Sequence, residues 1–558
     1  MRSLMCRLGA ASKAQRFIVT VYLFVGTCGM LLAEDAKELR TSNDNARPTL
    51  LNDLPSYIEK ARKDFNVPGI AVAVVKDGNV VFERGIGLRN LQSAIPVDAH
   101  TMFCIASNTK SFTATAIEIL ADEGKLNLDD RVIDHLPWFK MSDPYATREI
   151  RIRDLLAHRS GLGSHAGDLL FVPGTTYSLR EVVERLRYLP LSTGFRNSFA
   201  YENIMFAVAT LIIEQASGKS YANFIQEHIF QPIRMTESRV DSSFLRPEDN
   251  TATSYAQQPN GTLLAMPLLA WKNNQGAAGI YSSVHDMSKW LQVQLANGKL
   301  TNEVGGSSHR LLSEEGQQRM WSMITPIDID DAPVPELRAA QPNFLGYAEG
   351  WYLSDFRGQR LVWHDGGFPG TVSLVTMIPA LHLGVVVLTN QQSMSALKAI
   401  TNHILDGFLA VPPTDWIDNY IAADKLEAAQ TAEAARKLNA HHNLNAKPSL
   451  DLKRYAGTYR DSWCGDIKIQ LARGVLQMHF PNSPRLVGSL SPWDQSAFLV
   501  HWADPTLNAD AIIQFSMGDD GRIRGASMRR ASPYVAHAYD YQDLHLVRIV
   551  SEKSMPSQ

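Results

Sequence analysis

Cysteine is scarce in this chain, and the common metal-binding motifs are missing from it. Only four cysteines occur among 558 residues, and there is no Cys-x-x-Cys pair and no His-Glu-x-x-His segment. The sequence therefore offers no motif for a zinc site, and we expect neither a metal nor a cofactor. If an N-terminal signal is removed, Cys104 and Cys464 remain. We assign them to different domains, so a disulfide framework is not expected.

Charge of either sign is also not concentrated anywhere. The chain has 54 Lys and Arg against 57 Asp and Glu, a net charge of −3, without a basic block. Phosphate binding needs clustered Lys and Arg, so nucleic acid is not an expected partner. No Gly-x-Ser-x-Gly segment occurs, which argues against an α/β-hydrolase fold. With 45% hydrophobic residues, a chain of this length can bury a large core and form two or three domains.

One long apolar run is present, near the N-terminus. Basic residues from Arg2 to Arg16 precede the apolar stretch 17–33, and Glu34 and Asp35 follow it. This order is typical of an export signal cleaved after Ala33, so the sequence predicts a secreted or periplasmic protein. Two alternatives stay open: an uncleaved membrane anchor, because the run is near the lower limit for a span, and lipidation at Cys28. No other membrane contact is expected.

The segment Ser-Asn-Thr-Lys at 107–110 follows an apolar strand end and begins a predicted helix. Apolar residues at 112, 116, 119 and 120 share one helical face, which predicts a helix from Ser107 to about Gly124. Residues three apart lie on the same face, so Lys110 would stand beside the Ser107 hydroxyl. The helix N-terminus favours negative charge at the serine. Burial would lower the pKa of the lysine, so that its amine can act as a base.

Two further segments follow Ser107–Lys110 along the chain. Tyr201-Glu202-Asn203 precedes a helical run over 204–217, and His364-Asp365-Gly366 ends a strand-like run over 360–363. The three segments resemble the three motifs of the serine β-lactamase and penicillin-binding protein superfamily, specifically its class C and esterase-like branch. The segments 155–162 (Leu-Leu-Ala-His-Arg-Ser-Gly-Leu) and 276–282 (Gly-Ala-Ala-Gly-Ile-Tyr-Ser) add to the resemblance. It extends from about Pro68 to about Thr389.

The resemblance implies acyl transfer through a covalent intermediate. Ser107 would be the nucleophile. Lys110 or Tyr201 would be the base, and the sequence leaves this choice open because coupled groups titrate as a pair. Asn203 would form hydrogen bonds with Lys110 and with the substrate amide.

The third motif would contribute to substrate binding. His364 takes the place of the family's lysine and Gly366 completes the motif. Gly367 would supply one oxyanion amide, with Ser107 supplying the other. With a reference pKa of about 6.5, His364 would carry at most a partial charge and attract anions weakly. Its neighbour Asp365, like Glu202 in the second motif, is expected to point away from the chemistry.

The resemblance therefore implies a serine hydrolase that acts on a small-molecule or peptide substrate. Peptides or amides that contain D-amino acids, or small esters, are the expected substrates. Two alternatives are a β-lactamase, which the missing lysine disfavours, and a non-catalytic cell-wall-binding or sensory protein on the same fold. A homo-oligomer is compatible with the sequence.

Strand patterns on both sides of a helical section predict the fold. A hairpin about Asp77-Gly78 and later strands at 346–351, 361–364, 371–378 and 385–389 enclose a helical region at about 110–300. This order predicts an antiparallel sheet closed by the two chain ends, flanked by helices and with an all-α subdomain inserted: the α/β plus all-α fold of the β-lactamase-like family. The catalytic groove is expected between the two parts.

Five short apolar runs after residue 450 predict a small antiparallel barrel or sandwich, at 467–471, 475–480, 497–502, 511–515 and 522–528. The segment 455–459 (Tyr-Ala-Gly-Thr-Tyr) resembles the lipocalin-like β-domain of some secreted members. We expect this domain to be removable without unfolding the catalytic part. The predicted organisation is a signal peptide at 1–33, a disordered segment at 34–50, the β-lactamase-like domain at 51–411, a helical linker at 412–449 and the barrel-like domain at 450–550.

Overall fold

A computed structural model describes residues 50–246, 248–258, 260–269, 271–300, 309–440 and 446–549. The predicted signal peptide and residues 34–49 of the predicted disordered segment lie outside these ranges, while Leu50 begins a helix over 50–64. Within the described ranges, no helix is both long and apolar enough to cross a membrane. The chain forms two units. The smaller contains residues 50–57 and 402–414, where the rings of Tyr57 and His403 stack with centroids 3.7 Å apart.

An antiparallel sheet forms the centre of the larger unit and joins the two ends of the catalytic region. β1 pairs with β13, with Ile70 opposite Thr389, so the predicted closure of the sheet is confirmed. In sheet order, the strands that the structure describes are β3 (Ile95–Pro96), β2 (Asn79–Asn90), β1 (Gly69–Lys76), β13 (Leu383–Thr389), β12 (Thr371–Ile378), β11 (Gln359–Phe368), β10 (Tyr352–Phe356), β9 (Leu345–Tyr347) and β8 (Thr325–Pro326).

Two turns show why the strands begin and end where they do. The predicted hairpin is confirmed: Asp77 and Gly78 both have positive φ, +52° and +79°, as a two-residue hairpin turn requires. The strand predicted over 346–351 is wrong beyond Tyr347. There the chain turns at Gly350, whose φ is +70° and whose position would place a Cβ 2.7 Å from the Lys110 carbonyl oxygen. The positive φ lies outside the extended region and so ends the strand, and the close approach requires glycine at this position.

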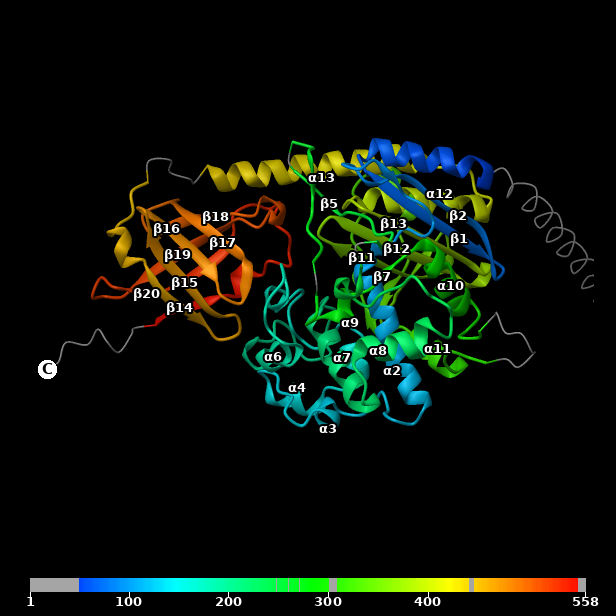
Figure 1. Cartoon of the computed structure of the whole chain (residues 1–558), viewed down its shortest axis with the longest axis horizontal. Coiled ribbons are helices and arrows are strands. Elements are labelled where there is room, and N and C mark those ends of the chain that lie inside the picture. Colours follow the sequence, from blue (N-terminus) through cyan, green and yellow to red (C-terminus); the bar gives the residue numbers. More distant parts are fainter. Residues whose placement is uncertain are drawn as a thin grey trace, which may run out of the picture. The chain divides into compact units, whose positions relative to one another are not determined.

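Helices flank the sheet: most of them lie below it in Figure 1, and the long helix over 416–439 runs above it. The helix predicted after Ser107 is confirmed as a 3₁₀ turn over Ala106–Asn108 that continues into α2 (Thr109–Asp122). The helix predicted over 204–217 is α7 (Ile204–Ser217), and α2 and α7 contact each other. The other α-helices are α3 (Val132–His135), α4 (Pro144–Glu149), α5 (Ile152–Leu155), α6 (Leu179–Glu184), α8 (Tyr221–Ile225), α9 (Gln275–Ala278), α10 (Val284–Leu295), α11 (Glu314–Met320), α12 (Met394–Leu409) and α13 (Trp416–Asn439).

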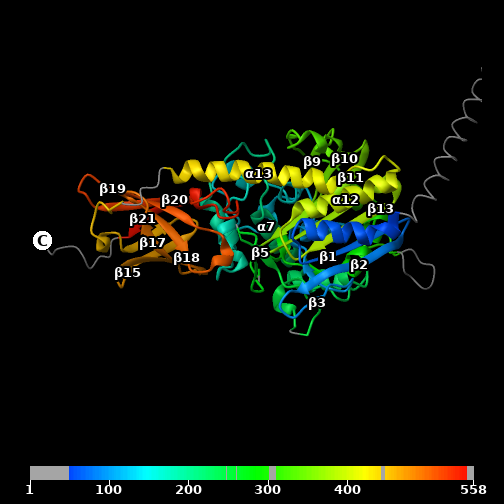
Figure 2. The same cartoon turned by 90° about the horizontal axis from the view of Figure 1, so that it is seen from above.

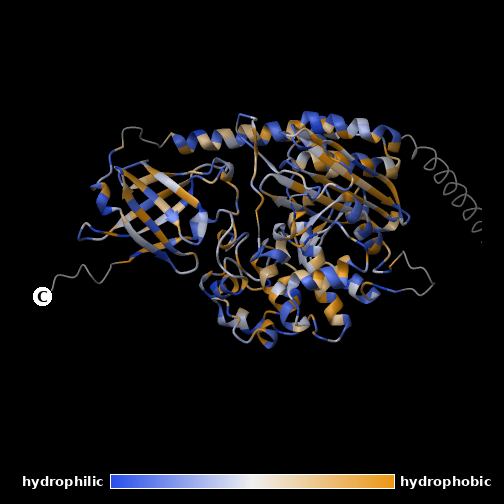
Figure 3. Cartoon of the chain, viewed as in Figure 1, coloured by the Kyte–Doolittle hydropathy of each residue, from blue (hydrophilic) through white to orange (hydrophobic). Residues whose placement is uncertain are grey.

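The C-terminal strands close into an antiparallel barrel, which confirms the predicted all-β domain. Figure 3 shows hydrophobic and hydrophilic residues alternating along its strands, as expected where one face is buried and the other meets solvent. The strands that the structure describes there are β14 (Gly457–Asp461), β15 (Gly465–Ala472), β16 (Val475–Phe480), β17 (Ser483–Pro492), β18 (Ala497–Trp502), β19 (Ala511–Met517), β20 (Ile523–Arg530) and β21 (His545–Ile549). Strands β14, β17 and β21 were not among the predicted runs, because polar residues, proline or glycine interrupt their apolar pattern. Helix α13 precedes the barrel as one continuous element (Figure 2).

The barrel is built onto the helical subdomain. One continuous cluster of buried apolar side chains includes Leu170 and Ile204 from the helical subdomain and Trp463 from the barrel. The Tyr177 hydroxyl donates to the Cys464 carbonyl oxygen at 2.6 Å. Further hydrogen bonds join Arg185 Nη1 to the Trp463 carbonyl at 2.7 Å, Thr176 N to the Asn482 carbonyl at 2.8 Å, and Gly167 N and Leu169 N to Asp540 at 2.8 and 3.2 Å.

These contacts argue against the expectation that the barrel can be removed without consequence. Deleting the chain after residue 440 would expose part of a shared core and leave buried donors without partners, at about 1–3 kcal/mol for each buried group. We expect the truncated protein to unfold at least about 5 °C below the full chain, or to aggregate. Thermal unfolding followed by circular dichroism measures this. An unchanged midpoint would show that the catalytic part folds independently.

Candidate active site

The chain places Ser107 in a constrained turn at the start of α2. β4 (Phe103–Cys104), which pairs with β7 (Tyr281–Ser282), leads into it, and Ala106 takes the left-handed conformation at φ +47°. A non-glycine residue in that region is uncommon and concentrates at functional sites. Gly366 of β11 fits closely against this turn: a Cβ there would lie 2.2 Å from the Ile105 carbonyl oxygen and 3.0 Å from Ser107 N.

Lys110 lies beside the serine, as the spacing predicts. Its Nζ is 3.0 Å from Ser107 Oγ, 2.7 Å from Asn203 Oδ1 and 3.0 Å from the Ala277 carbonyl oxygen. The side chain is fully buried, and its pKa falls to about 7 because burial penalises the ammonium form. A substantial fraction of the amine is therefore neutral near pH 7 and can take up a proton.

Tyr201 meets the same serine from the helical side. Its phenol shares a hydrogen bond with the Ser107 side chain, and Lys110 Nζ lies 4.8 Å from the centroid of its ring. Burial raises the pKa of the phenol well above its usual value, an effect larger than that of the serine hydrogen bond. Tyr201 is therefore a neutral proton donor in this environment. Of the two candidate bases that the sequence left open, the pKa values favour Lys110.

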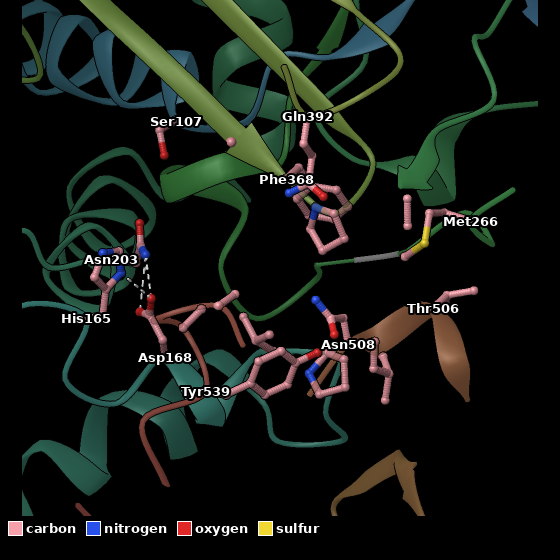
Figure 4. A pocket seen from close by; sticks show the side chains of 18 of the residues that line it. Ser107, His165, Asp168, Asn203, Met266, Phe368, Gln392, Thr506, Asn508 and Tyr539 are labelled. Atoms are coloured by element: carbon pink, nitrogen blue, oxygen red, sulfur yellow. Dashed lines mark hydrogen bonds and ion pairs between the residues drawn. The ribbon is translucent and has the colours of Figure 1, made fainter. Parts of the chain in front are cut away.

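Asn203 holds the lysine and is itself held by Asp168, a residue that sequence reasoning missed. The amide Nδ2 donates to both carboxylate oxygens of Asp168, at 2.9 and 3.2 Å. His165 Nδ1 lies 2.9 Å from the same carboxylate. Figure 4 shows Asn203 and His165 both directed at Asp168. In the sequence, only the position of Asp168 just after the glycine-containing segment 161–167 could have marked it as a candidate site residue.

The third motif departs from its expected role. His364 is fully buried, its Nε2 lies 2.8 Å from the Tyr347 hydroxyl, and burial lowers its pKa to about 3. The expected partial charge is therefore absent at neutral and mildly acidic pH. Neither His364 nor Gly366 is among the described residues that line the pocket, whereas Gly367 is. A Cβ at Gly367 would meet nothing within 4 Å, so its backbone borders open space beside the serine.

The middle residues of the two later motifs differ from each other. Glu202 is buried and accepts a hydrogen bond from the Ser160 hydroxyl at 2.7 Å. The loss of hydration raises its pKa well above the usual range. Asp365, by contrast, lines the pocket, which corrects the expectation that it points away. Its carboxyl group has a raised pKa, again because of lost hydration.

A pocket of about 530 Å³ opens over the serine, and three parts of the chain line it. Asn203 and Asp168 come from the helical side, and Gly367 and Phe368 from the sheet. Figure 4 shows that Thr506, Asn508 and Tyr539 of the barrel lie across the pocket from Ser107. The sequence predicted a groove between sheet and helices and left open whether the C-terminal domain covers it; Thr506, Asn508 and Tyr539 form its third wall. Within the described ranges, no group of three metal-ligating side chains that could hold an ion occurs.

Comparison with known proteins defines the class. Residues 54–406 match the beta-lactamase family, and residues 441–548 match a domain of unknown function. The first match covers more than half of the chain, so the protein belongs to the beta-lactamase family, and it is a serine hydrolase.

Particular relatives support the same class. An unguisins hydrolase of Aspergillus campestris is 29% identical over 448 residues, which cover 75% of this chain and 77% of that protein. Protein flp of Staphylococcus aureus is 27% identical over 362 residues, 65% of this chain and 66% of its own. Among solved structures, the octameric penicillin-binding protein homologue from Pyrococcus abyssi has a TM-score of 0.55 at 22% identity and covers 89% of this chain and 99% of its own. SurE has a TM-score of 0.52 at 18% identity, with 90% and 100% covered. At these identities the two structures show the fold alone.

Proposed function

We propose that the protein hydrolyses amide or ester bonds of small peptide-like substrates through an acyl-enzyme on Ser107, with Lys110 as the base. One observation carries the proposal: a buried amine with a pKa of about 7 lies 3.0 Å from the serine hydroxyl. The serine proton passes to Lys110 Nζ as Oγ bonds to the substrate carbonyl carbon. The backbone N–H groups of Ser107 and Gly367 would stabilise the oxyanion. As the bond from the carbonyl carbon to the leaving group breaks, the leaving group takes the proton from Lys110, either directly or through the Tyr201 phenol, which Lys110 then reprotonates. Water next attacks the acyl carbon and gives a proton to the neutral Lys110. The bond to Ser107 Oγ breaks, Lys110 returns the proton to Oγ, and the acid product leaves.

The pocket supports a peptide-like substrate with aromatic or apolar side chains. Trp271, Phe368 and Tyr539 contribute aromatic walls beside polar groups such as Asn508. The similarity to an unguisins hydrolase supports hydrolysis as the reaction. Amides and peptides of D-amino acids, or small esters, are the substrates we propose to test first. We also propose export to the periplasm or the medium, on the basis of the N-terminal apolar run. Homo-oligomerisation stays a prediction, and the octameric state of the Pyrococcus homologue is compatible with it.

The experiment is intact-protein mass spectrometry after exposure to a D-amino-acid amide, a p-nitrophenyl ester and a penicillin. A mass increase equal to the acyl group, on the peptide that contains Ser107, supports the proposal, and turnover of the first two separates hydrolysis from mere acylation. Acylation by penicillin with rapid turnover would instead favour a β-lactamase. No adduct with any probe, together with no turnover, would favour a non-catalytic binding protein.

The charges in the pocket predict which substrate groups are accepted next to the scissile bond. Asp365 lines the pocket and His364 is neutral, and the only arginine or lysine among the described lining residues is Arg485, which is ion-paired with Asp504. We expect substrates with a free amine or no charge beside the scissile bond to be preferred over carboxylates by about tenfold in kcat/KM, roughly 1.4 kcal/mol.

Asp365→Asn should reduce this preference. Asp77→Asn removes the same charge at an exposed hairpin turn and should leave it unchanged. Values of kcat/KM for one acyl group with carboxylate, carboxamide and amine neighbours measure the effect. Equal preferences in the wild type and in Asp365→Asn would show that Asp365 does not face the substrate.

A further inference from the structure

A carboxylate of the C-terminal barrel reaches the loop that supports the active site. Asp540 lies between β20 and β21, and 1% of its surface is exposed. Its two oxygens accept hydrogen bonds from the backbone N–H groups of Gly167, at 2.8 Å, and Leu169, at 3.2 Å. These groups flank Asp168 on both sides. The barrel therefore holds the one short stretch of backbone from which the Asp168 side chain projects.

That stretch is not held by regular secondary structure of its own. It is a single 3₁₀ turn over Asp168–Leu170, entered through His165 and Gly167, which both have positive φ, +63° and +82°. A Cβ at Gly167 would lie 2.9 Å from Leu189 Cδ1, so the loop is also closely packed. A short turn with two left-handed residues needs external partners to keep one conformation, and Asp540 supplies two of them.

From Asp168 the contacts continue to the nucleophile. The Asp168 carboxylate accepts from Asn203 Nδ2 at 2.9 Å, which fixes which end of the amide faces it. The amide oxygen therefore faces Lys110 and accepts from Nζ at 2.7 Å. Lys110 in turn lies 3.0 Å from Ser107 Oγ. A displacement at the loop is thus passed to the base through two hydrogen-bonded side chains.

We propose that Asp540 is a positioning residue for acyl transfer, through which the C-terminal domain completes the active site of the catalytic domain. This inference rests on the proposed function, since it assumes that Lys110 and Ser107 perform the chemistry. Asp540 does not touch the substrate. It acts through the loop, Asp168 and Asn203. The C-terminal domain is therefore required for the rate of the chemical step as well as for the wall of the pocket.

The test uses the full chain with three substitutions. Asp540→Ala removes both acceptors, and Asp540→Asn keeps the size and one acceptor. Asp461→Ala is the matched control, because Asp461 is a similarly buried barrel carboxylate, 2% exposed. Its hydrogen bonds in the described structure come from the backbone N–H groups of Trp463, Cys464 and His545, at 2.7–2.8 Å, all within the barrel. Active sites are counted by fluorophosphonate labelling, so that misfolded protein does not enter the rate.

We expect Asp540→Ala to lower kcat per labelled site by about 10- to 100-fold with KM changed less than about threefold, because the base is displaced while the pocket remains. Asp540→Asn should fall between it and the wild type. Asp461→Ala should lose thermal stability and keep its kcat. A kcat of Asp540→Ala within twofold of the wild type per labelled site, or an equal loss in Asp461→Ala, overturns the inference. Absence of labelling in the wild type itself would instead overturn the proposed function.

Discussion

Replacing Ser107 with alanine is expected to abolish covalent labelling by fluorophosphonates and β-lactams and to lower kcat/KM by at least about a thousandfold. The hydroxyl is the group that Lys110 and Tyr201 both approach, and neither can replace it as a nucleophile. The fold should survive, because Ser107 is the N-cap residue neither of the 3₁₀ turn, which is Ile105, nor of α2, which is Asn108. Labelling followed by peptide mapping, with thermal unfolding in parallel, measures both effects.

Ser111→Ala is a suitable control for this experiment. Ser111 lies one turn further along α2, is buried, and its hydroxyl donates to the Asn108 carbonyl oxygen at 2.8 Å. The variant should keep its labelling at Ser107. If labelling of Ser107→Ala persists and maps to another serine, the assignment of the nucleophile is wrong.

The second large effect concerns Lys110. Because burial lowers its pKa to about 7, kcat/KM should be low at pH 5, rise tenfold per pH unit well below pH 7, and level off above about pH 8. Lys110→Met, which keeps the length and removes the amine, should lose about a thousandfold or more in kcat/KM. Lys125→Met, at a side chain 44% exposed, should behave as the wild type. A profile that is flat from pH 5 to 9, with chemistry rate-limiting, would contradict Lys110 as the base.

The same buried amine has a consequence for stability. The unfolded chain binds a proton at lysine up to pH 10.4 or so, whereas the folded state releases it near pH 7, so stability should rise with pH between these values. Below pH 7 the folded state carries the cost of a buried ammonium group. Lys110→Met should therefore unfold several degrees higher than the wild type at pH 6, and the difference should shrink towards pH 9. A lower midpoint at pH 6 would show that the three hydrogen bonds of Nζ outweigh the cost of burial.

The sequence predicted those features that depend on residues close together in the chain. The spacing from Ser107 to Lys110 is a property of one helix, and the structure brings these two side chains within 3.0 Å of each other as that spacing requires. The hairpin at Asp77-Gly78 and the helix at 204–217 follow from turn chemistry and periodicity. The antiparallel sheet and the barrel followed from the order of strand and helix patterns along the chain.

Tertiary structure alone decided the rest. His364 was expected to be partly charged, yet complete burial, together with the nearby charge of Lys110, lowers its pKa and keeps it neutral, and burial depends on residues distant in the sequence. Asp168 and Asp540 carry no motif, and they become important only because folding sets them against Asn203 and the loop at 167–169. Sequence patterns indicate which backbone conformation a segment prefers. The hydration and the neighbours of a polar side chain, which set its pKa and its hydrogen bonds, are decided only when the domains pack.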